Sequence, residues 1–256
     1  MNERQKLRYS RHILLKDMGE TGQEKISQSC ALVIGAGGLG SAALIYLASS
    51  GVGKITIVDD DAVEIHNLQR QVIHSTGRIG LSKAESARQT LYGINPTIDV
   101  KAVTERMTED SLPELVKNAD VVLDCTDNFA IRTAINRVCM KEGIPLVSGA
   151  AVGFDGQVSV YDPRKEDCPC YACLYPEDME FKDIKAAQIG VFAPAVGLIG
   201  VLQAAEALKI LAGVGQTLSG SLLLLDALAM EWTKLKVDRN PACPVCSKRN
   251  TSKKPT

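Results

Sequence analysis

The sequence has 256 residues, of which 45% are apolar, and a formal net charge of −1 at pH 7. That length and apolar fraction suffice to bury one full core, so we expect a single domain over residues 1–256. The near-zero charge excludes a general attraction to nucleic acid or to an anionic membrane, so any partner has to be recognised by a local site.

The N-terminal segment, residues 1–28, is expected to form a helical arm. It contains no apolar stretch long enough for a signal-peptide core, which indicates a cytoplasmic protein. Its charged residues include Glu3, Arg4, Lys6, Arg8, Arg11 and Lys16. In a reducing cytoplasm, the eight cysteines of the chain are expected to be metal ligands or buried thiols rather than disulfides.

The segment over residues 29–161 has the pattern of a nucleotide-binding βαβ fold. An apolar run, Cys30–Ile34, leads into a glycine-rich turn and then into an Ala- and Leu-rich helix over residues 39–50. A second strand, Lys54–Val58, ends in three aspartates. The turn has the pattern Gly-x-Gly-x-x-Gly, and its glycines are Gly35, Gly37, Gly38 and Gly40.

The glycine turn and the first aspartate together indicate a bound nucleotide. Glycines let the backbone approach phosphate oxygens, and the following helix presents free N–H groups at its positive end. Asp59 lies about 20 residues beyond the last glycine, where its carboxylate can accept hydrogen bonds from ribose hydroxyls. The alternative is that the glycines serve only a tight strand-to-helix turn.

Polar side chains suited to a polyphosphate follow the aspartates. Asn67 and Arg70 lie in the sequence Asn-Leu-Gln-Arg-Gln, and Lys83 comes near the start of the next helix. Guanidinium, ammonium and amide groups can neutralise and hydrogen-bond a triphosphate. Taken alone, each basic residue is more typical of a solvated surface charge. Their closeness to the glycine turn favours the nucleotide.

Further elements continue the alternation of helices and strands. Ser82 and Glu85 form a capping-box pattern at the start of a helix that is expected to end at about residue 92. Asn128 and Gly143 are expected to cap and to end a helix between two strands. The predicted elements are a helix to about residue 92 and strands over residues 121–123 and 145–147. The alternation predicts a Rossmann-like, doubly wound α/β fold around a mostly parallel sheet.

Asp127 follows the strand at residues 121–123, at the sheet edge where ligands bind in open α/β folds. A carboxylate there can hold magnesium against phosphate oxygens. The alternative is that Asp127 or Asn128 only caps the next helix. Both roles can coexist, with Asn128 as the cap and Asp127 on the metal.

The C-terminal half is expected to add antiparallel strands and one long helix. The predicted strands cover residues 156–161, 221–225 and 232–237. The helix is expected over residues 194–211. The stretch from residue 191 is the best candidate for a membrane span, but Gln203, Glu206 and Lys209 interrupt it. We therefore expect a core helix, with a partner-binding surface as the alternative.

Two Cys-x-x-Cys pairs predict a structural zinc site. Four thiolates fill the tetrahedral coordination of zinc and leave no position for water or substrate. The pairs are Cys170 with Cys173 and Cys243 with Cys246. The metal is expected to anchor a mobile loop, residues 162–189, to the C-terminal part at 190–246, which precedes a polar tail at 247–256. A redox disulfide pair is the alternative, and Cys168 is a poorer match to the ligand spacing.

In this order, the motifs resemble the ThiF/MoeB family of sulfur-carrier-protein adenylyltransferases, relatives of ubiquitin-activating enzymes. The resemblance covers nearly the whole chain. It rests on residues 7–11, the glycine turn, Asp59, residues 67–71, Lys83, residues 124–128 and the two cysteine pairs. It implies an ATP-dependent enzyme that converts the C-terminal Gly-Gly carboxylate of a small ubiquitin-like carrier into an acyl-adenylate and releases pyrophosphate.

The resemblance also implies roles for single residues. ATP would be held by Gly35, Gly37, Gly38, Gly40, Asp59, Asp61, Asn67, Arg70, Lys83, Asp127 and Asn128, with magnesium on Asp127. The catalytic set would be Arg11, Arg70, Lys83 and Asp127. Because Arg11 matches a residue that reaches the nucleotide site of a neighbouring subunit, a homodimer is implied. A carboxylate is already ionised at neutral pH, so no general base is needed.

The chain departs from the family at one position. Several members carry a cysteine where Ala186 stands here. Adenylation is therefore expected without a covalent carrier thioester or persulfide at that place. Sulfur would be delivered by another protein, such as a cysteine desulfurase, and the carrier would be ThiS-like or MoaD-like, for thiamine or molybdopterin synthesis.

Other functional classes are kept as alternatives. They are a nicotinamide-dependent oxidoreductase, a zinc-stabilised nucleotide sensor and a tRNA-modifying dehydratase of the same superfamily. A dehydrogenase would need an acid–base pair at a hydride site, and the sequence offers no plausible one. The four cysteines and the Asn-Leu-Gln-Arg-Gln sequence favour carrier activation over the dehydratase.

Overall fold

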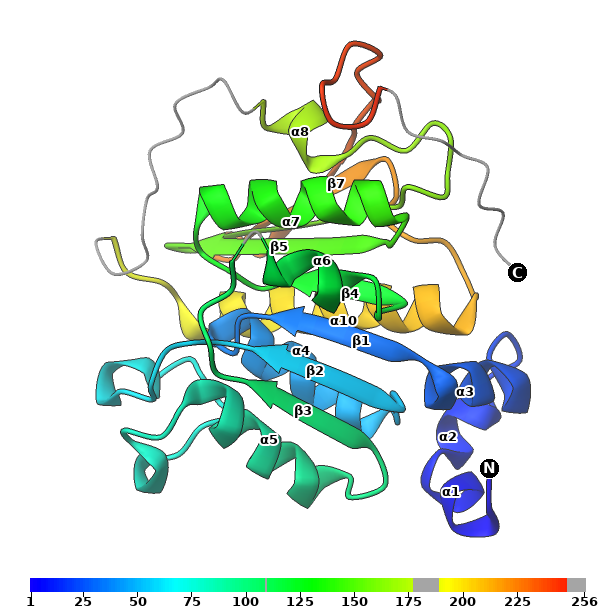
Figure 1. The fold of residues 1–256 in the computed structure, drawn as a ribbon, viewed down its shortest axis with the longest axis vertical. Coiled ribbons are helices and arrows are strands. Elements are labelled where there is room, and N and C mark those ends of the chain that lie inside the picture. The colour runs from blue at the N-terminus through cyan, green and yellow to red at the C-terminus, as the bar shows by residue number, and fades with distance from the viewer. Residues whose placement is uncertain (109, 177–188, 248–256) are drawn as a thin grey trace.

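The computed structural model describes residues 1–108, 110–176 and 189–247, and an eight-stranded sheet forms its centre. The strand order is β3-β2-β1-β4-β5-β6-β7-β8 (Figure 1). The strands are β1 (Cys30–Ile34), β2 (Lys54–Val58), β3 (Asp99–Val103), β4 (Val121–Asp124), β5 (Leu146–Val152), β6 (Asp155–Tyr161), β7 (Ser221–Asp226) and β8 (Glu231–Lys236). Pairs from β3 to β5 are parallel, and those from β5 to β8 are antiparallel. This confirms the predicted α/β fold with antiparallel C-terminal strands.

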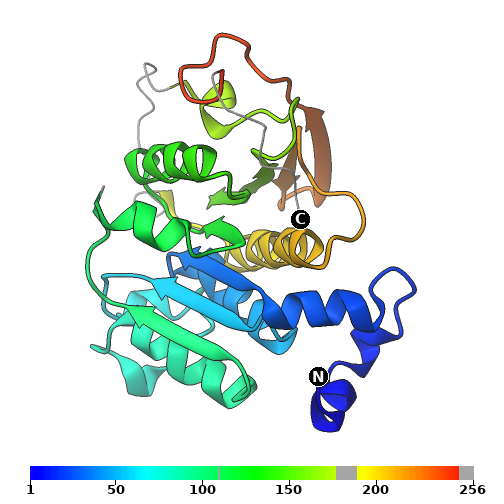
Figure 2. The same ribbon diagram turned by 45° about the vertical axis from the view of Figure 1, so that its right-hand side comes forward.

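Helices cover both faces of the sheet. They are α1 (Glu3–Arg8), α2 (Ser10–Ile13), α3 (Gly19–Gln28), α4 (Gly38–Ser49), α5 (Lys83–Ile94), α6 (Ser111–Val116), α7 (Phe129–Glu142), α8 (Tyr171–Leu174) and α10 (Ala193–Ala212), with short 3-10 turns η1 (Ile65–Asn67) and η2 (Thr76–Arg78). Along β1, Ala31 and Val33 join the core under α4, α5 and α10, whereas Leu32 and Ile34 join the core under α6 and α7. The two layers lie in front of and behind the sheet (Figures 1 and 2). Alternate residues of β1 thus face two different cores, and both faces of the strand are buried. This explains why a central parallel strand has a continuous apolar sequence.

The sequence pattern did not predict the strand β3 or the helix α6. Asp99 and Lys101 are exposed on β3, an edge strand, so no apolar run marks it. The helix α6 has six residues, one of which is Pro113. The prediction for β5 was also too short, since antiparallel pairing with β6 continues the strand to Val152.

Helix caps follow the predicted side chains, with one correction. The Asn128 Oδ1 accepts a hydrogen bond from the Ile131 N–H at 3.1 Å, and Gly143 ends α7 in the left-handed conformation at φ +77°. Ser82 caps α5 by accepting from the Glu85 N–H. The Glu85 carboxylate, however, binds Arg88 instead of completing the capping box, because the guanidinium offers two charge-assisted hydrogen bonds. The helix continues beyond residue 92 to Ile94.

The long apolar helix α10 packs beside α4 and against β4, β5 and β6. By length and composition this helix could cross a membrane. However, 56% of its apolar 18-residue stretch is buried inside this structure. Gln203 is fully buried on it and donates to the backbone carbonyls of Asp124 and Val147 at 2.7 and 3.2 Å. A Cβ on Gly200 would lie 2.3 Å from the Leu39 carbonyl oxygen, so this glycine sets the close approach to α4. These contacts support the prediction of a core helix.

A short helix, α8, lies within the segment predicted to be a loop at residues 162–189. Its Tyr171 and Ala172 are buried, as are the nearby Asp162 and Cys168. Four residues are too few to show helical periodicity, which is why the pattern missed α8. The remainder of the predicted loop, residues 177–188, and the tail from residue 248 lie outside the described residues, so their mobility stays a prediction.

The contact at Gly200 predicts a difference between two glycines of α10. Gly200→Ala is expected to lower the free energy of unfolding by about 1–3 kcal/mol, because α10 and α4 have to move apart. Gly197→Ala is the matched control, since its Cβ would meet no atom within 4 Å, and helix propensity is expected to stabilise it by up to about 1 kcal/mol. Urea denaturation measures both changes. Equal stabilities of the two variants would contradict the proposed packing role of Gly200.

Candidate active site

A cavity of about 470 Å³ opens at the carboxyl ends of β1, β2 and β4. Its walls come from the glycine turn, the aspartates after β2, the segment after η1 and the start of α5. The residues predicted to hold a nucleotide that line it are Gly35, Gly37, Gly38, Asp59, Asp61, Asn67, Arg70, Lys83 and Asp127. The fold therefore brings together, in one cavity, side chains that the sequence separates by up to 92 residues.

The four glycines of the turn are needed for different physical reasons. Gly35 has φ +97°, and a Cβ there would lie 2.7 Å from the Cys125 carbonyl oxygen. A Cβ on Gly40 would lie 1.9 Å from the Gly35 carbonyl oxygen, and one on Gly38 would lie 2.4 Å from Val196. At Gly37 the nearest atom would be the Gln71 Nε2 at 3.6 Å. Packing thus requires three of the glycines, whereas Gly37 keeps cavity space open.

Asp59 is tied to the glycine turn in this structure. Its Oδ2 accepts from the Ala36 N–H at 2.7 Å, and its Oδ1 accepts from the Asp61 N–H at 3.0 Å. Burial raises the pKa of Asp59, while these two hydrogen bonds act in the opposite direction. The carboxylate therefore fixes the turn as well as facing the cavity where a ribose is expected.

His74 forms a hydrogen bond with the same turn. Its Nε2 lies 2.9 Å from the Ala36 carbonyl oxygen and its Nδ1 lies 2.9 Å from the Ser86 hydroxyl. A carbonyl can only accept, so Nε2 carries the proton and donates. Burial lowers the pKa of His74, which favours this neutral form. The prediction of an ordinary hydrogen-bonding role agrees with this geometry.

The cationic and amide groups of the cavity are held by local contacts. The Lys83 side chain is only 8% exposed, and its Nζ lies 2.7 Å from the Asp61 Oδ2. Arg70 donates from Nη1 to the His66 carbonyl oxygen at 3.2 Å. Asn67 is buried, and its Oδ1 accepts from the Glu64 N–H at 3.4 Å. Lys83 and Arg70 thus both line the cavity, where positive groups can bind phosphate oxygens.

The two aspartates at the end of β4, Asp124 and Asp127, have different environments and different roles. Asp124 is fully buried and accepts from the Ser148 hydroxyl and from the Thr126 N–H and hydroxyl. Asp127 is exposed and lines the cavity, so it alone of the pair offers carboxylate oxygens to a metal. Asn128 caps α7 and does not line the described cavity, and neither does Gly40. For these last two residues a direct nucleotide contact stays a prediction.

Arg11 lies away from this cavity within one copy of the chain. It is exposed on α2, and α3 leads from there into the first residue of β1. The arrowheads of β1 to β3 point away from α1, α2 and α3 (Figure 1). The arm therefore lies at the amino ends of the strands, while the cavity lies at their carboxyl ends.

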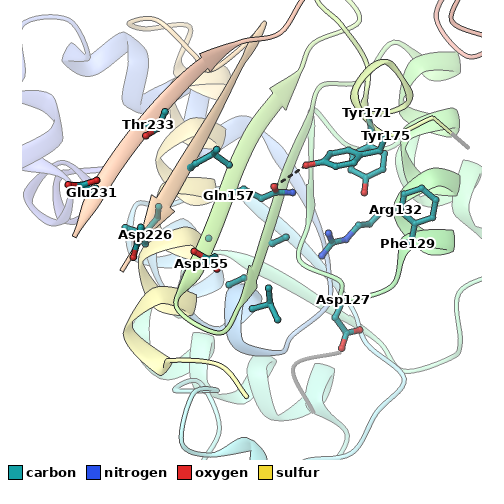
Figure 3. A pocket seen from close by; sticks show the side chains of 16 residues that line it. Asp127, Phe129, Arg132, Asp155, Gln157, Tyr171, Tyr175, Asp226, Glu231 and Thr233 are labelled. Atoms are coloured by element: carbon teal, nitrogen blue, oxygen red, sulfur yellow. Dashed lines mark hydrogen bonds between the residues drawn. The ribbon is translucent and has the colours of Figure 1, made fainter. Parts of the chain in front are cut away.

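A second cavity, of about 640 Å³, adjoins the first (Figure 3). Strands β5 to β8 form its floor, and α7 and α8 supply Phe129, Tyr171 and, just beyond α8, Tyr175. The rings of Tyr171 and Tyr175 lie 4.7 Å apart between centroids, and the Tyr175 hydroxyl donates to the Gln157 Oε1 at 2.9 Å. Asp127, Arg132 and Ala151 line both cavities.

The sequence pattern did not single out this second cavity. Its lining comes from α7, α8 and four antiparallel strands, and only the fold brings them together. One signal was present, because Arg132 stands four residues after Asn128 and so lies on the same face of α7 as the helix start. A cation one helical turn behind the ligand-binding edge is a candidate for binding an anion.

The four cysteines of the two Cys-x-x-Cys pairs come together as predicted. Their sulfur atoms all lie within 4.8 Å of one another. The closest pairs, Cys173 with Cys246 and Cys170 with Cys243, are separated by 3.5 and 3.6 Å. These separations exceed the roughly 2.05 Å of a disulfide bond and suit four thiolates around one zinc ion. Hydrogen bonding to the neighbouring Cys170 thiol lowers the pKa of Cys173.

The geometry agrees with comparisons of the whole chain. A model of the ThiF family matches residues 9–245. The chain belongs to the ThiF family. It is 43% identical over 246 residues to the molybdopterin-synthase adenylyltransferase of Salmonella typhimurium, which covers 96% of this chain and 98% of that protein. It is 44% identical over 250 residues to the sulfur carrier protein ThiS adenylyltransferase of Escherichia coli, with 98% of both chains covered.

A solved structure of similar fold contains a nucleotide. Escherichia coli MccB, determined with ATP, has a TM-score of 0.82 and is 25% identical, and the match covers 94% of this chain and 75% of MccB. The likeness to MccB agrees with the α/β fold described above.

The cysteine cluster predicts a metal that stabilises the fold. Purified protein is expected to contain a single zinc ion per chain. Cys243→Ser should lose it and lower the Tm by on the order of 10 °C, because zinc closes a long loop between two distant segments. Cys30→Ser is the matched control, since Cys30 lies outside the cluster. Metal analysis and calorimetry measure both, and a full zinc content in Cys243→Ser would disprove the ligand assignment.

Proposed function

We propose that this chain is an ATP-dependent adenylyltransferase that activates the C-terminal carboxylate of a small sulfur-carrier protein. The observation that carries the proposal is the junction of two cavities, one lined by polyphosphate-binding groups and the other lined by aromatic side chains, at Asp127 and Arg132. We assign ATP to the first cavity and an extended chain terminus to the second. The names of the relatives, which include a sulfur carrier protein ThiS adenylyltransferase, support the same reaction.

The reaction needs positioning and charge neutralisation. A carboxylate oxygen of the carrier attacks the α-phosphorus of ATP, a new oxygen–phosphorus bond forms, and the bond to the β-phosphate breaks so that pyrophosphate leaves. Lys83, Arg70 and Asn67 would bind the phosphate oxygens, and Asp59 would bind the ribose. The attacking group is already an anion at neutral pH, so the protein removes no proton.

Magnesium fits the oxygen donors at the junction. Asp127 offers an exposed carboxylate to both cavities, which suits a hard cation that also binds phosphate oxygens. Bound there, the ion would supply neutralisation of the phosphate charge. Asp124 is excluded from this task, because its carboxylate is buried under hydroxyl and N–H donors.

A homodimer would complete the site with Arg11 from a second copy. Within one copy, Arg11 lies at the opposite ends of the strands from the cavity. The arm around it exposes Leu7, Leu14 and Leu15 at 76%, 72% and 55%. Such side chains lose contact with water when a second copy covers them, which favours association through the arm.

The pathway in which the protein is proposed to act depends on the carrier that it activates. The protein is proposed to act in the cytoplasm and to receive its carrier from the thiamine or the molybdopterin pathway. A cysteine desulfurase or another sulfur donor would convert the adenylate into a thiocarboxylate. Ala186, where a relay cysteine is absent, lies outside the described residues, so adenylation without a covalent intermediate there stays a prediction.

ATP–pyrophosphate exchange tests the reaction and Asp127. Wild-type protein is expected to exchange label only when a Gly-Gly-ended carrier is added, with ThiS-like and MoaD-like carriers supplied one at a time. Asp127→Asn is expected to lower exchange by at least about a hundredfold, since it removes a charge from the phosphate site. Asp99→Asn, on the distant strand β3, is the control and should match the wild type. Undiminished exchange in Asp127→Asn would remove Asp127 from the mechanism, and no exchange with any carrier would disprove the proposed function.

Coexpression of two inactive variants tests whether Arg11 acts across a dimer. Arg11→Ala and Lys83→Ala are each expected to lack exchange activity. A mixed dimer contains one site with both native residues and one with neither. With random assembly, about a quarter of the wild-type activity should therefore return, measured against each variant alone. Failure to regain activity, with mixed dimers shown by differential tagging, would place Arg11 outside the partner's site.

A further inference from the structure

We propose that Arg132 binds the carboxylate of the carrier tail and holds it against the α-phosphate of ATP. The proposal rests on the proposed function and names the residue that receives the attacking group. Arg132 extends from α7 toward the strands and lines both cavities where they meet (Figure 3). A cation at that junction can touch a chain terminus in one cavity and a phosphate in the other, and Arg132 is the one cation among the described residues that line both.

The second cavity would otherwise repel an anion. Asp155 on β6 lies opposite Asp226 on β7, and Asp226 lies opposite Glu231 on β8, so three carboxylates stand in a row across its floor. Like charges placed opposite one another destabilise a sheet. Arg132 is the only lysine or arginine among the described residues that line this cavity. A carrier carboxylate in this cavity therefore has one cation among the described lining residues, Arg132, that can bind it.

The guanidinium has capacity for that carboxylate. Arg132 donates from Nη2 to the Thr126 carbonyl oxygen, and its side chain is 14% exposed. The Nε–H is buried and has no hydrogen-bond partner in the described part of the chain. The nearest carboxylate oxygen, the Asp124 Oδ2, lies 3.9 Å from Nε, which is too far for a hydrogen bond. A guanidinium has five N–H donors, so a carboxylate can be bound while the backbone contact is kept.

Asp124 lies close to this cation but accepts no hydrogen bond from its Nε. The Asp124 carboxylate is satisfied by Ser148 and by the N–H and hydroxyl of Thr126. Its charge nevertheless favours the ionised form of Arg132 and raises the pKa of the guanidinium against the effect of burial. The arrangement keeps a charged donor at the junction of the two cavities.

The test compares a carrier that ends in a carboxylate with the same carrier that ends in a carboxamide. The carrier is the ThiS-like or MoaD-like protein that stimulates exchange, prepared in both forms, and calorimetry with the full chain measures each Kd. Wild-type protein is expected to bind the carboxylate form at least about tenfold more tightly, as a charge-assisted hydrogen bond provides. Arg132→Gln should bind both forms equally. A purely structural role would weaken both forms by the same factor and keep the wild-type preference.

Controls separate charge recognition from folding. Arg137→Gln, on the same helix but lining neither cavity, should keep the preference. If Arg132→Gln alone does not fold with Asp124 left buried, the double variant Asp124→Asn with Arg132→Gln removes both charges together. It should also bind the two forms equally, and Arg132→Lys should show an intermediate preference and a raised KM for the carrier.

Three outcomes decide the proposal. Loss of the carboxylate preference in Arg132→Gln or in the double variant, with the preference kept in Arg137→Gln, supports it. A wild-type preference in a folded Arg132→Gln variant, or in the double variant, overturns it while leaving carrier activation in place. Absence of both exchange and carrier binding in the wild type overturns the proposed function, and this inference with it.

Discussion

The cavity at the carboxyl ends of β1, β2 and β4, which is proposed to bind the nucleotide and is called here the nucleotide cavity, depends on the reversal of strand order around β1. The chain adds β2 and β3 on one side of β1 and then returns to place β4 on the other side. The helices that follow β1 and β4 consequently cover opposite faces of the sheet, and α4 joins one core while α7 joins the other. Their loops diverge at the carboxyl edge, and the crevice between them is where open α/β sheets bind ligands. This divergence places the glycine turn after β1 and Asp127 after β4 on two sides of the same cavity.

The second cavity depends on the change from parallel to antiparallel pairing at β6. A parallel strand has to return by a long crossover, whereas β6 follows β5 directly and pairs with it over seven residues. The strand β5 therefore continues past the end of β4, and its Ala151 reaches the wall shared by both cavities. Since β7 and β8 extend the same surface, four antiparallel strands form the floor of the second cavity beside the nucleotide cavity.

The sequence predicted those features that one local rule decides. Central strands such as Lys54–Val58, the Asn128 cap and the Gly143 helix end were correct, because burial on both faces, a side-chain acceptor or a left-handed turn each leaves a local pattern. The edge strand Asp99–Val103 and the helix α8 were missed, since their stability comes from neighbours in space rather than from their own periodicity. For the same reason the nucleotide cavity could be assembled from motifs, whereas the pairing of Arg132 with Tyr171 and Gln157 around a second cavity could not.

The position of the cysteine cluster links the metal to that second cavity. Cys170 and Cys173 flank Tyr171, whose backbone N–H donates to the buried Asn136 on α7 at 3.0 Å and whose ring lies against Tyr175. Cys243 and Cys246 come from the segment that follows β8, the last strand of the floor. A segment of four helical residues cannot hold two aromatic rings by its own hydrogen bonds. Ligation to a second segment 73 residues away would remove that freedom. A metal remote from the phosphates would then fix the aromatic wall along which the carrier tail is proposed to run.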